Sequence, residues 1–491
     1  MSPIHERERH LSRRQFISHS AAGLGTAGLA YLLGQNGLGA APSRIGGAEQ
    51  FGGLRGLPHM APKAKNVIHL FMSGGPTHVD LFDWKPRLQQ MHGEVVPDAY
   101  VGDKVFSTMT GAANGKVMLA PIEPFAQHGQ SGAWVSEFLP HTAGIVDDLC
   151  FVKSLHTDSV NHAPAVTFML TGAPQPGRPA MGAWLSYGLG AETEDLPAYV
   201  VLTSVTQGTT CGQTFNEFYW GNGFLPSRYQ GVKFRRGSEP VLYLENAPGI
   251  SDKMKRNVLE EIAKINERKL HEMGDPEIST RISQYEMAAR MQLSVPELSD
   301  FSDESKDVLA SYGPQANTPG TFAHNCVMAR RLIERGSRYI QVMHAGWDQH
   351  NSITTELYGQ CHDTDQPSAA LVQDLKQRGL LDDTLVIWGG EFGRTPFIQG
   401  NLGERHRWGR DHHPYAFTNW LAGAGVKPGF TYGETDDLGF NIIKDPVHVH
   451  DLQATVLKLL GVDHERLTYR FQGRDFRLTD VHGKIIDPIL S

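Results

Sequence analysis

Cysteine is scarce in this chain, and its spacing gives no metal-binding pattern. Only four cysteines occur among the 491 residues. They stand too far apart for the short spacings of a cysteine zinc site: Cys150, Cys211, Cys326 and Cys361. We expect buried thiols, with one optional disulfide as the alternative.

Excess positive charge and a second long apolar run are also missing. The formal net charge is -8 at pH 7, whereas a nucleic-acid partner requires a basic face on the protein. No apolar stretch after residue 41 is long enough to cross a bilayer. We therefore expect no nucleic-acid partner and no membrane span in the mature protein.

The N-terminus carries a pattern typical of export. Arg13 and Arg14 precede a short Gly/Ala-rich apolar run over 21–33, and small residues follow at 39–41. Paired arginines before such a run indicate a twin-arginine signal. We predict a signal peptide over 1–41, the twin-arginine translocase as a partner during export, and a periplasmic or extracellular location. An uncleaved anchor, or a basic N-terminus before a stray helix, are the alternatives.

The remaining chain has the pattern of an α/β protein. Residues 42–63 are rich in Gly and Pro and are predicted to form a flexible leader before one domain over 64–491. Apolar strands alternate with helices, which indicates a mostly parallel central sheet with helices on both faces. The predicted strands are 67–72, 149–152, 198–202, 339–343 and 384–388, and the predicted helices include 323–334, 369–378 and 451–460.

Imidazoles and carboxylates gather where these strands end. In a parallel sheet the carboxyl ends of the strands share one edge, where functional groups collect. The candidate metal ligands in these segments are His78, Asp80, Asp348, His350, Glu391, His412 and His413. Mixed imidazole and carboxylate ligands favour zinc, manganese or iron over calcium.

Each segment also has a simpler interpretation. His78 and Asp80 are compatible with a pair that stabilises a turn, and the segment around His412 with a surface loop. A buried Glu391 needs a cation or several hydrogen-bond donors to stay ionised, and Arg394 could supply that charge without any metal.

Residues 161–172 predict a helix with a polar start, an apolar body and a glycine stop. His162 stands in its first turn, where backbone N–H groups and the helix dipole favour an anion or a charged nucleophile. The alternative is an ordinary helix that carries a histidine in this position.

Several motifs resemble known families. The stretch 380–393 resembles the segment of sulfatases and alkaline-phosphatase-like enzymes that normally ends in Ser-Asp-His-Gly. The stretch 162–172 is similar to the sulfatase segment Cys-x-Pro-Ser-Arg-x-x-Leu-Leu-Thr-Gly. Over roughly 66–475 the chain looks closest to a bacterial family catalogued as domain of unknown function 1501. That likeness rests on Gly-Gly-Pro-Thr-His-x-Asp at 74–80, Gly-Glu-Phe-Gly-Arg-Thr-Pro at 390–396 and Gly-Arg-Asp-His-His-Pro at 409–414.

The resemblance implies an alkaline-phosphatase/sulfatase-like fold and a hydrolase of phosphate or sulfate esters with one or two metals. Two departures weaken parts of that pattern. Phe392 stands where a histidine ligand is expected, and His162 replaces the cysteine that sulfatases convert to formylglycine. His162 is therefore expected to be a ligand, a general acid/base or an unusual nucleophile, and Arg394 to hold an anionic oxygen.

The sequence thus predicts an exported, metal-dependent hydrolase of an anionic small-molecule or polysaccharide ester. Two alternatives stay open: an inactive relative that binds anionic glycans, and a protein that keeps its metal only for stability.

Overall fold

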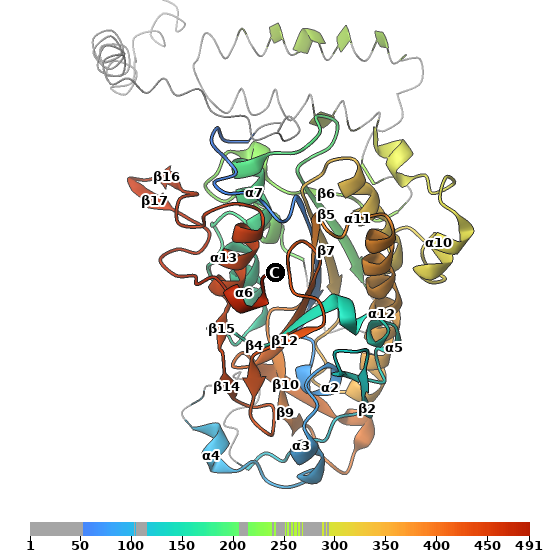
Figure 1. Ribbon diagram of the computed structural model, residues 1–491, viewed down its shortest axis with the longest axis vertical. Helices are drawn as coiled ribbons and strands as arrows, with labels where there is room; N and C mark the ends of the chain where they lie inside the picture. Colours follow the sequence, from blue (N-terminus) through green and yellow to red (C-terminus); the bar gives the residue numbers. More distant parts are fainter. Residues whose placement is uncertain are drawn as a thin grey trace, which may run out of the picture. The chain divides into compact units, whose positions relative to one another are not determined.

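The central strand β1 (Asn66–Ser73) is buried along its whole length. It pairs in parallel with β7 (Tyr339–Ala345) on one side and with β8 (Thr384–Gly389) on the other. All three strands are continuously buried, as expected where helices cover both faces of a parallel sheet. The computed structural model in Figure 1 shows these strands at the centre of the domain.

Further strands extend this sheet in both directions. β5 (Tyr199–Val205) pairs in parallel with β7, and β6 (Val232–Lys233) with β5. Beyond β8, β11 (Phe417–Ala422) runs antiparallel to both β8 and β4 (Leu149–His156). β12 (Phe430–Tyr432) and β15 (Val447–His448) pair in parallel with β4. The order is β12-β4-β11-β8-β1-β7-β5-β6, with β15 also on β4. The predicted mostly parallel sheet is confirmed, although its antiparallel member β11 was not expected.

Helices cover both faces of the sheet, as predicted. α6 (His162–Thr171), α7 (Met181–Leu189) and α13 (Val449–Leu459) lie on one face, and α11 (Phe322–Glu334) and α12 (Ile353–Gln377) on the other (Figure 1). Side chains alternate along β1, so Val67 and Phe71 join the core under the first set of helices, while Ile68 and Leu70 join the second core.

Shorter elements complete the domain. The small helices are α2 (His78–Leu81), α3 (Pro86–Gln90), α4 (Asp98–Val101), α5 (Pro140–Ala143) and α10 (Lys306–Ser311). Among the described residues, two-stranded sheets pair β2 (Phe125–His128) with β3 (Ala133–Ser136), β9 (Gly393–Gln399) with β10 (Gly409–His413), β13 (Glu434–Thr435) with β14 (Ile442–Lys444), and β16 (Tyr469–Phe471) with β17 (Arg474–Phe476).

The structure describes residues 53–102, 104, 115–205, 215–237, 240–241 and 294–491, with scattered positions between 251 and 291. The predicted signal peptide and Cys211 lie outside these residues, whereas Cys150, Cys326 and Cys361 are buried free thiols. In the described part of the chain, no helix combines the length and apolar character needed to span a bilayer.

The second half of the predicted leader is part of the domain. Leu54 donates its backbone N–H to Gly188 on α7, and His59 and Met60 donate theirs to Gly461 beyond α13. These bonds fix the backbone of this segment against two helices. Composition predicted a flexible leader here and did not show these hydrogen-bond partners.

One buried histidine on β1 predicts sensitivity to acid. His69 is 2% exposed, and burial lowers its pKa from 6.5 to about 4. Between these values the unfolded chain binds the extra proton, so the free energy of unfolding decreases as the pH falls. At pH 4.5 this one group costs about 2.5 kcal/mol relative to pH 7. Urea unfolding of the wild type and of His69→Gln at both pH values checks this. The variant is expected to lose less stability on acidification, and equal losses would contradict the assignment.

Candidate metal centre

Four segments that are distant in the sequence meet at one edge of the sheet. β4, β7 and β8 are parallel, so their carboxyl ends lie together, and antiparallel β11 begins at the same edge. His162 opens α6 after β4, while Asp348 and His350 follow β7. His412 lies on β10, just before β11, and its strand pairs with β9 so that His412 stands opposite Arg394.

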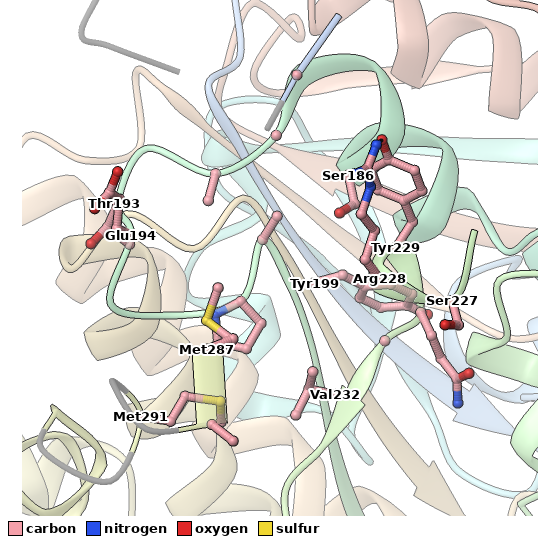
Figure 2. A pocket seen from close by; sticks show the side chains of 18 of the residues that line it. Ser186, Thr193, Glu194, Tyr199, Ser227, Arg228, Tyr229, Val232, Met287 and Met291 are labelled. Atoms are coloured by element: carbon pink, nitrogen blue, oxygen red, sulfur yellow. Dashed lines mark hydrogen bonds between the residues drawn. The ribbon is translucent and has the colours of Figure 1, made fainter. Parts of the chain in front are cut away.

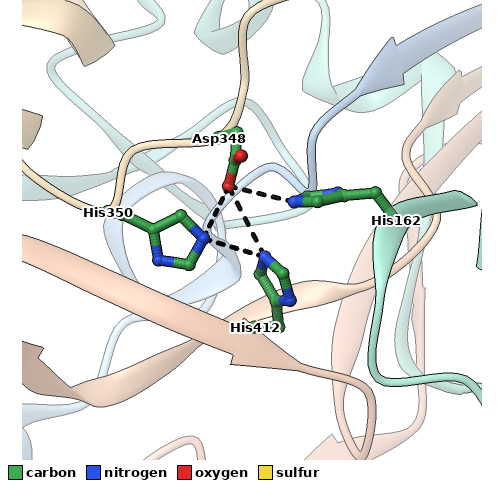
Figure 3. A group of neighbouring side chains, drawn as sticks. All are labelled: His162, Asp348, His350 and His412. Atoms are coloured by element: carbon green, nitrogen blue, oxygen red, sulfur yellow. Dashed lines mark hydrogen bonds and ion pairs between the residues drawn. The ribbon is translucent and has the colours of Figure 1, made fainter. Parts of the chain in front are cut away.

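Three imidazoles converge on one carboxylate oxygen (Figure 3). The Oδ1 atom of Asp348 lies 3.0 Å from His162 Nε2, 2.9 Å from His350 Nε2 and 3.5 Å from His412 Nε2. The Nε2 atoms of His350 and His412 are themselves only 2.9 Å apart. The donor atoms of these four residues all lie within 4.8 Å of one another. We call this group the metal cluster.

The second ring nitrogen of each imidazole, Nδ1, contacts a hydrogen-bond acceptor. His162 Nδ1 lies 2.7 Å from Glu391 Oε1, His350 Nδ1 lies 2.5 Å from Gln399 Oε1, and His412 Nδ1 lies 2.8 Å from the carbonyl of Val160. A carboxylate, an amide oxygen and a carbonyl accept there, so in its neutral form each imidazole carries its proton on Nδ1 and directs the lone pair of Nε2 to the cluster. This arrangement of outer partners is typical of histidines that bind a metal.

Several atoms that can accept a hydrogen bond or bind a cation face one point in this cluster. Three Nε2 atoms and an ionised carboxylate face the same point, and His162 Nε2 has no hydrogen bond of acceptable geometry although it is 3.0 Å from Asp348. Burial, aided by the charge of Arg394, lowers the pKa of His412 to about 3. A second proton is therefore disfavoured at His412, which leaves its Nε2 able to bind a cation at the shared point.

The geometry fits a divalent ion. With metal–nitrogen distances of 2.0–2.1 Å, two ligand atoms of a tetrahedral site lie about 3.3 Å apart. The four short distances given above, from 2.9 to 3.5 Å, bracket this value. His162, with 14% of its side chain exposed, is the most accessible member, and the other three are 4–8% exposed. Three imidazoles and one carboxylate suit zinc, manganese or iron.

Two charged neighbours set the electrostatics of the site. Arg394 is fully buried and donates to Asp348 Oδ1 at 2.6 Å. Burial would raise the pKa of Asp348, but Arg394 and the three histidines outweigh it and hold that pKa far below its usual range. Burial would lower the pKa of His162, but the nearby carboxylates of Asp348 and Glu391 outweigh burial and raise it.

Arg394 is placed differently from the sequence expectation. Its other N–H groups donate to the carbonyls of Gly74, Gly75, Trp347 and Arg410. These bonds tie together the loops after β1 and β7 and the strand β10. The structure therefore places this buried guanidinium among backbone carbonyls and Asp348, where it joins the segments that carry the cluster.

Glu391 lies behind the metal cluster rather than in it. Its side chain is fully buried, its two oxygens accept from the backbone N–H of Gly74 at 3.0 and 3.2 Å, and Oε1 also accepts from His162. Glu391 therefore orients a ligand instead of serving as one. Gly74 has φ +121, and a Cβ there would come within 2.7 Å of the backbone at Trp347 and Asp348, so only glycine permits this approach.

The structure places three other predicted ligands outside the cluster. Asp80 forms a fully buried ion pair with Arg410 at 2.6 and 2.9 Å and also accepts from Thr77 and from the Ile122 backbone. His78 and His413 stack on each other with ring centroids 5.9 Å apart, and they contact the carbonyls of Gly439 and Phe440. The carboxylate of Asp80 and the Nε2 atoms of both histidines are thus directed to protein groups.

Sequence reasoning missed Gln399, which orients His350. No local pattern marks this residue. Its position follows from the β9–β10 pairing, in which Gln399 stands opposite Gly409. Phe392, in turn, contacts His162 and His412 with ring centroids 4.9 and 4.7 Å away. The residue that replaces an expected ligand thus forms an apolar wall of the cluster.

A separate cavity of about 850 Å³ lies at the N-terminal end of β5, whereas the metal cluster lies at the carboxyl ends of the strands. Tyr199, the first residue of that strand, lines it together with Arg228 and Tyr229, while Met287 and Met291 form another wall (Figure 2). None of the residues predicted as ligands or catalytic groups lines this cavity.

Comparison with known proteins shows the family. No curated protein matches the sequence. Similar solved structures include a phosphonate monoester hydrolase of Agrobacterium radiobacter, at 12% identity over 88% of this chain and 77% of that one, with a TM-score of 0.35. They also include Ps i-CgsB in complex with k-i-k-neocarrahexaose, at 11% identity over 81% and 72% with a TM-score of 0.34. A third is a TAB5 alkaline phosphatase with Mg bound, at 10% identity over 81% and 98% with a TM-score of 0.33. Overlaps of this quality place no single residue. The model of the family described as Protein of unknown function (DUF1501) matches residues 64–490, and the chain therefore belongs to the DUF1501 family.

Proposed function

We propose that this protein binds one divalent metal ion through His162, Asp348, His350 and His412 and hydrolyses an anionic ester. The observation that carries the proposal is the convergence of three Nε2 atoms on Asp348 Oδ1. In each ring Nδ1 also contacts a hydrogen-bond acceptor outside the cluster. Such donors are preorganised for a metal, because a cation at the shared point can be bound by all four of them.

The charge of the site favours an anionic substrate. A divalent ion together with Asp348, Glu391 and Arg394 gives a net charge of +1 at a largely buried position. A bound ion of this kind supplies Lewis-acid chemistry, by withdrawing charge from an ester oxygen and by lowering the pKa of water. The resemblance to sulfatases and alkaline-phosphatase-like enzymes, seen in the motifs at 162–172 and 380–393, supports phosphate or sulfate esters as the class.

The protein's own groups have distinct tasks in this proposal. Glu391 keeps the proton of His162 on Nδ1, so that Nε2 stays available. Arg394 keeps Asp348 ionised and fixes the loops that carry it. His162 is the most exposed member of the cluster, so substrate approaches on its side.

One observation favours a second function, a metal held for stability. Catalytic zinc sites keep one open position, whereas structural sites are closed by four protein ligands. The cluster offers four protein donors. Binding of anionic glycans without turnover, on the same charged site, is the third possibility.

Activity measurements on metal-defined protein separate these functions. Protein purified without chelator is expected to hydrolyse at least one chromogenic phosphate monoester, phosphate diester or sulfate ester, to lose this activity on chelation, and to regain it with zinc, manganese or iron. Glu391→Gln should weaken metal affinity about 10–100-fold. Metal-loaded protein that is stabilised by its ion but turns over no ester would support the structural role. Tight glycan binding without turnover would support the binding role.

The twin-arginine motif at 13–14 supports action outside the cytoplasm. We therefore include export by the twin-arginine translocase in the proposal, with a small-molecule or polysaccharide ester encountered in the periplasm or the medium. Fractionation of cells that express the full chain tests it, since Arg13→Lys combined with Arg14→Lys should retain the protein inside.

A further inference from the structure

A second cavity with unusual charge lies beside β4 and β12. It measures about 610 Å³, and none of the four metal-cluster residues lines it. Its base is formed by Lys153 of β4 together with Asp83 and Lys85, which follow α2. Aromatic residues form its walls: Trp84, which stands between Asp83 and Lys85, and Phe430 and Tyr432 of β12.

Two ammonium groups share a single carboxylate at the base of this cavity. Asp83 Oδ1 lies 3.3 Å from Lys85 Nζ and 3.7 Å from Lys153 Nζ. The three side chains are only 12%, 15% and 4% exposed for Lys85, Lys153 and Asp83. Two positive charges and one negative charge leave one positive charge without a counter-ion in a place that water reaches poorly, which is costly unless an anion is supplied.

Lys153 is the less well compensated of the two lysines. Lys85 also donates to the carbonyl of Thr435 at 3.0 Å, and Thr435 donates its hydroxyl to Asp83. The distance of 3.7 Å between Lys153 and Asp83 is too long for a hydrogen bond. Burial lowers the pKa of Lys153, and a bound anion offsets that cost.

The charges at the rim do not cancel this excess. Glu434 and Lys444 stand opposite each other where β13 pairs with β14, and Asp445 follows them. All three are exposed, so solvent screens them. The base of the cavity keeps its positive charge, while its opening is mixed in sign.

The aromatic wall is rigid and half-buried. The ring of Trp84 stacks on Phe125 with centroids 5.4 Å apart and lies 6.0 Å from Trp134. Apolar walls with a few convergent polar groups are the usual composition of a small-molecule site. The flat rings can cover the face of a ligand ring, while the lysines select for a negative charge on it.

We propose that this cavity binds an acidic sugar unit, whose carboxylate or sulfate group pairs with Lys153 and Lys85 while its ring packs on Trp84 and Tyr432. The site is independent of the metal cluster. It would hold one unit of an acidic glycan, or the free sugar acid, by the same contacts.

Calorimetric titration of the metal-loaded protein with glucose 6-sulfate, glucuronate and neutral glucose tests the proposal. The two acidic sugars are expected to bind and glucose to bind at least tenfold more weakly. Lys153→Met should reduce the affinity for the acidic sugars at least about tenfold, since a hydrogen bond to a charged group is lost. Lys153→Arg, which keeps the charge, should retain most of it. The matched control Lys444→Met at the rim should change it less than twofold.

Three results would overturn the assignment. If a folded Lys153→Met variant binds the acidic sugars as tightly as the wild type, the lysines at the base of the cavity do not bind them. Equal affinity for glucose would exclude selection by charge, and equal affinity for inorganic sulfate would exclude a role for the aromatic wall. Glucuronate contains no ester bond for the metal centre to hydrolyse, so the effect of Lys153→Met on glucuronate binding tests this cavity separately from the proposed function.

Discussion

Replacing His412 with Gln is expected to abolish metal binding, whereas the same change at the adjacent His413 leaves the metal in place. His412 Nε2 belongs to the metal cluster, 2.9 Å from His350 Nε2. His413 Nε2 is directed to the carbonyl of Phe440, at 2.7 Å. Both residues are neutral in the fold, because burial lowers the pKa of each to about 3. The substitution thus changes no charge in either case.

Metal analysis by mass spectrometry of the three proteins, purified side by side without chelator, measures the effect. We expect one ion per chain in the wild type and in His413→Gln, and at least about a hundredfold weaker binding in His412→Gln, because loss of a ligand exceeds the 10–100-fold cost of losing an outer partner. Equal metal content in all three proteins would refute His412 as a ligand. Loss of metal from both variants would show that metal binding depends on the packing of this strand and not on His412 as a ligand.

The second large effect concerns stability. Asp80→Asn is expected to reduce the free energy of unfolding by about 3–5 kcal/mol while metal content stays unchanged. Asp80 and Arg410 are both fully buried and form a two-fold contact. With asparagine in place, the buried guanidinium of Arg410 loses its counter-ion, which is the costly way to break such a pair.

Urea denaturation with parallel metal analysis checks this prediction. Asp148→Asn is a suitable control, because Asp148 forms its ion pair with Lys376 at the surface and should change stability by no more than about 1 kcal/mol. A stable Asp80→Asn protein that lacks metal would restore Asp80 to the ligand set and contradict the structure.

The central sheet was predictable because its strands carry an unusually clear signal. β1, β7 and β8 are apolar almost throughout, and buried parallel strands require this pattern. The β9–β10 hairpin gave no such signal, since its buried positions include Arg394, Arg410 and His412. Polar residues on a buried strand are satisfied only by tertiary partners, and local sequence does not show those partners.

Helix α12 shows the same limit. The sequence indicated a helix over 369–378, but the structure has one from Ile353 to Gln377 with Pro367 inside it. Its first half carries buried polar side chains, among them Asp365, which accepts hydrogen bonds from the backbone of His141 and Thr142 at the start of α5. A helix face that buries a carboxylate against another helix lacks the continuous apolar stripe by which a helix is recognised in the sequence.

For the site, the residue types were predictable but their grouping was not. Asp348, His350 and His412 do meet, and His162 joins them. Neighbouring residues on a strand point to opposite sides, so of the adjacent His412 and His413 on β10 only one could enter the cluster. Asp80 forms an ion pair with Arg410, which belongs to the same segment, 409–414, that was expected to supply further metal ligands.

The wide separation of partners along the chain has a consequence for biosynthesis. Val67 of β1 pairs with Tyr339, and Asn66 pairs with Thr384. The nascent polypeptide cannot form the centre of its main sheet until the ribosome has synthesised β8. The last histidine of the metal cluster, His412, is synthesised after that. Any capture of the ion at full affinity must then be a late event that follows the synthesis of His412. Prematurely terminated chains would hold isolated donors that bind it only weakly.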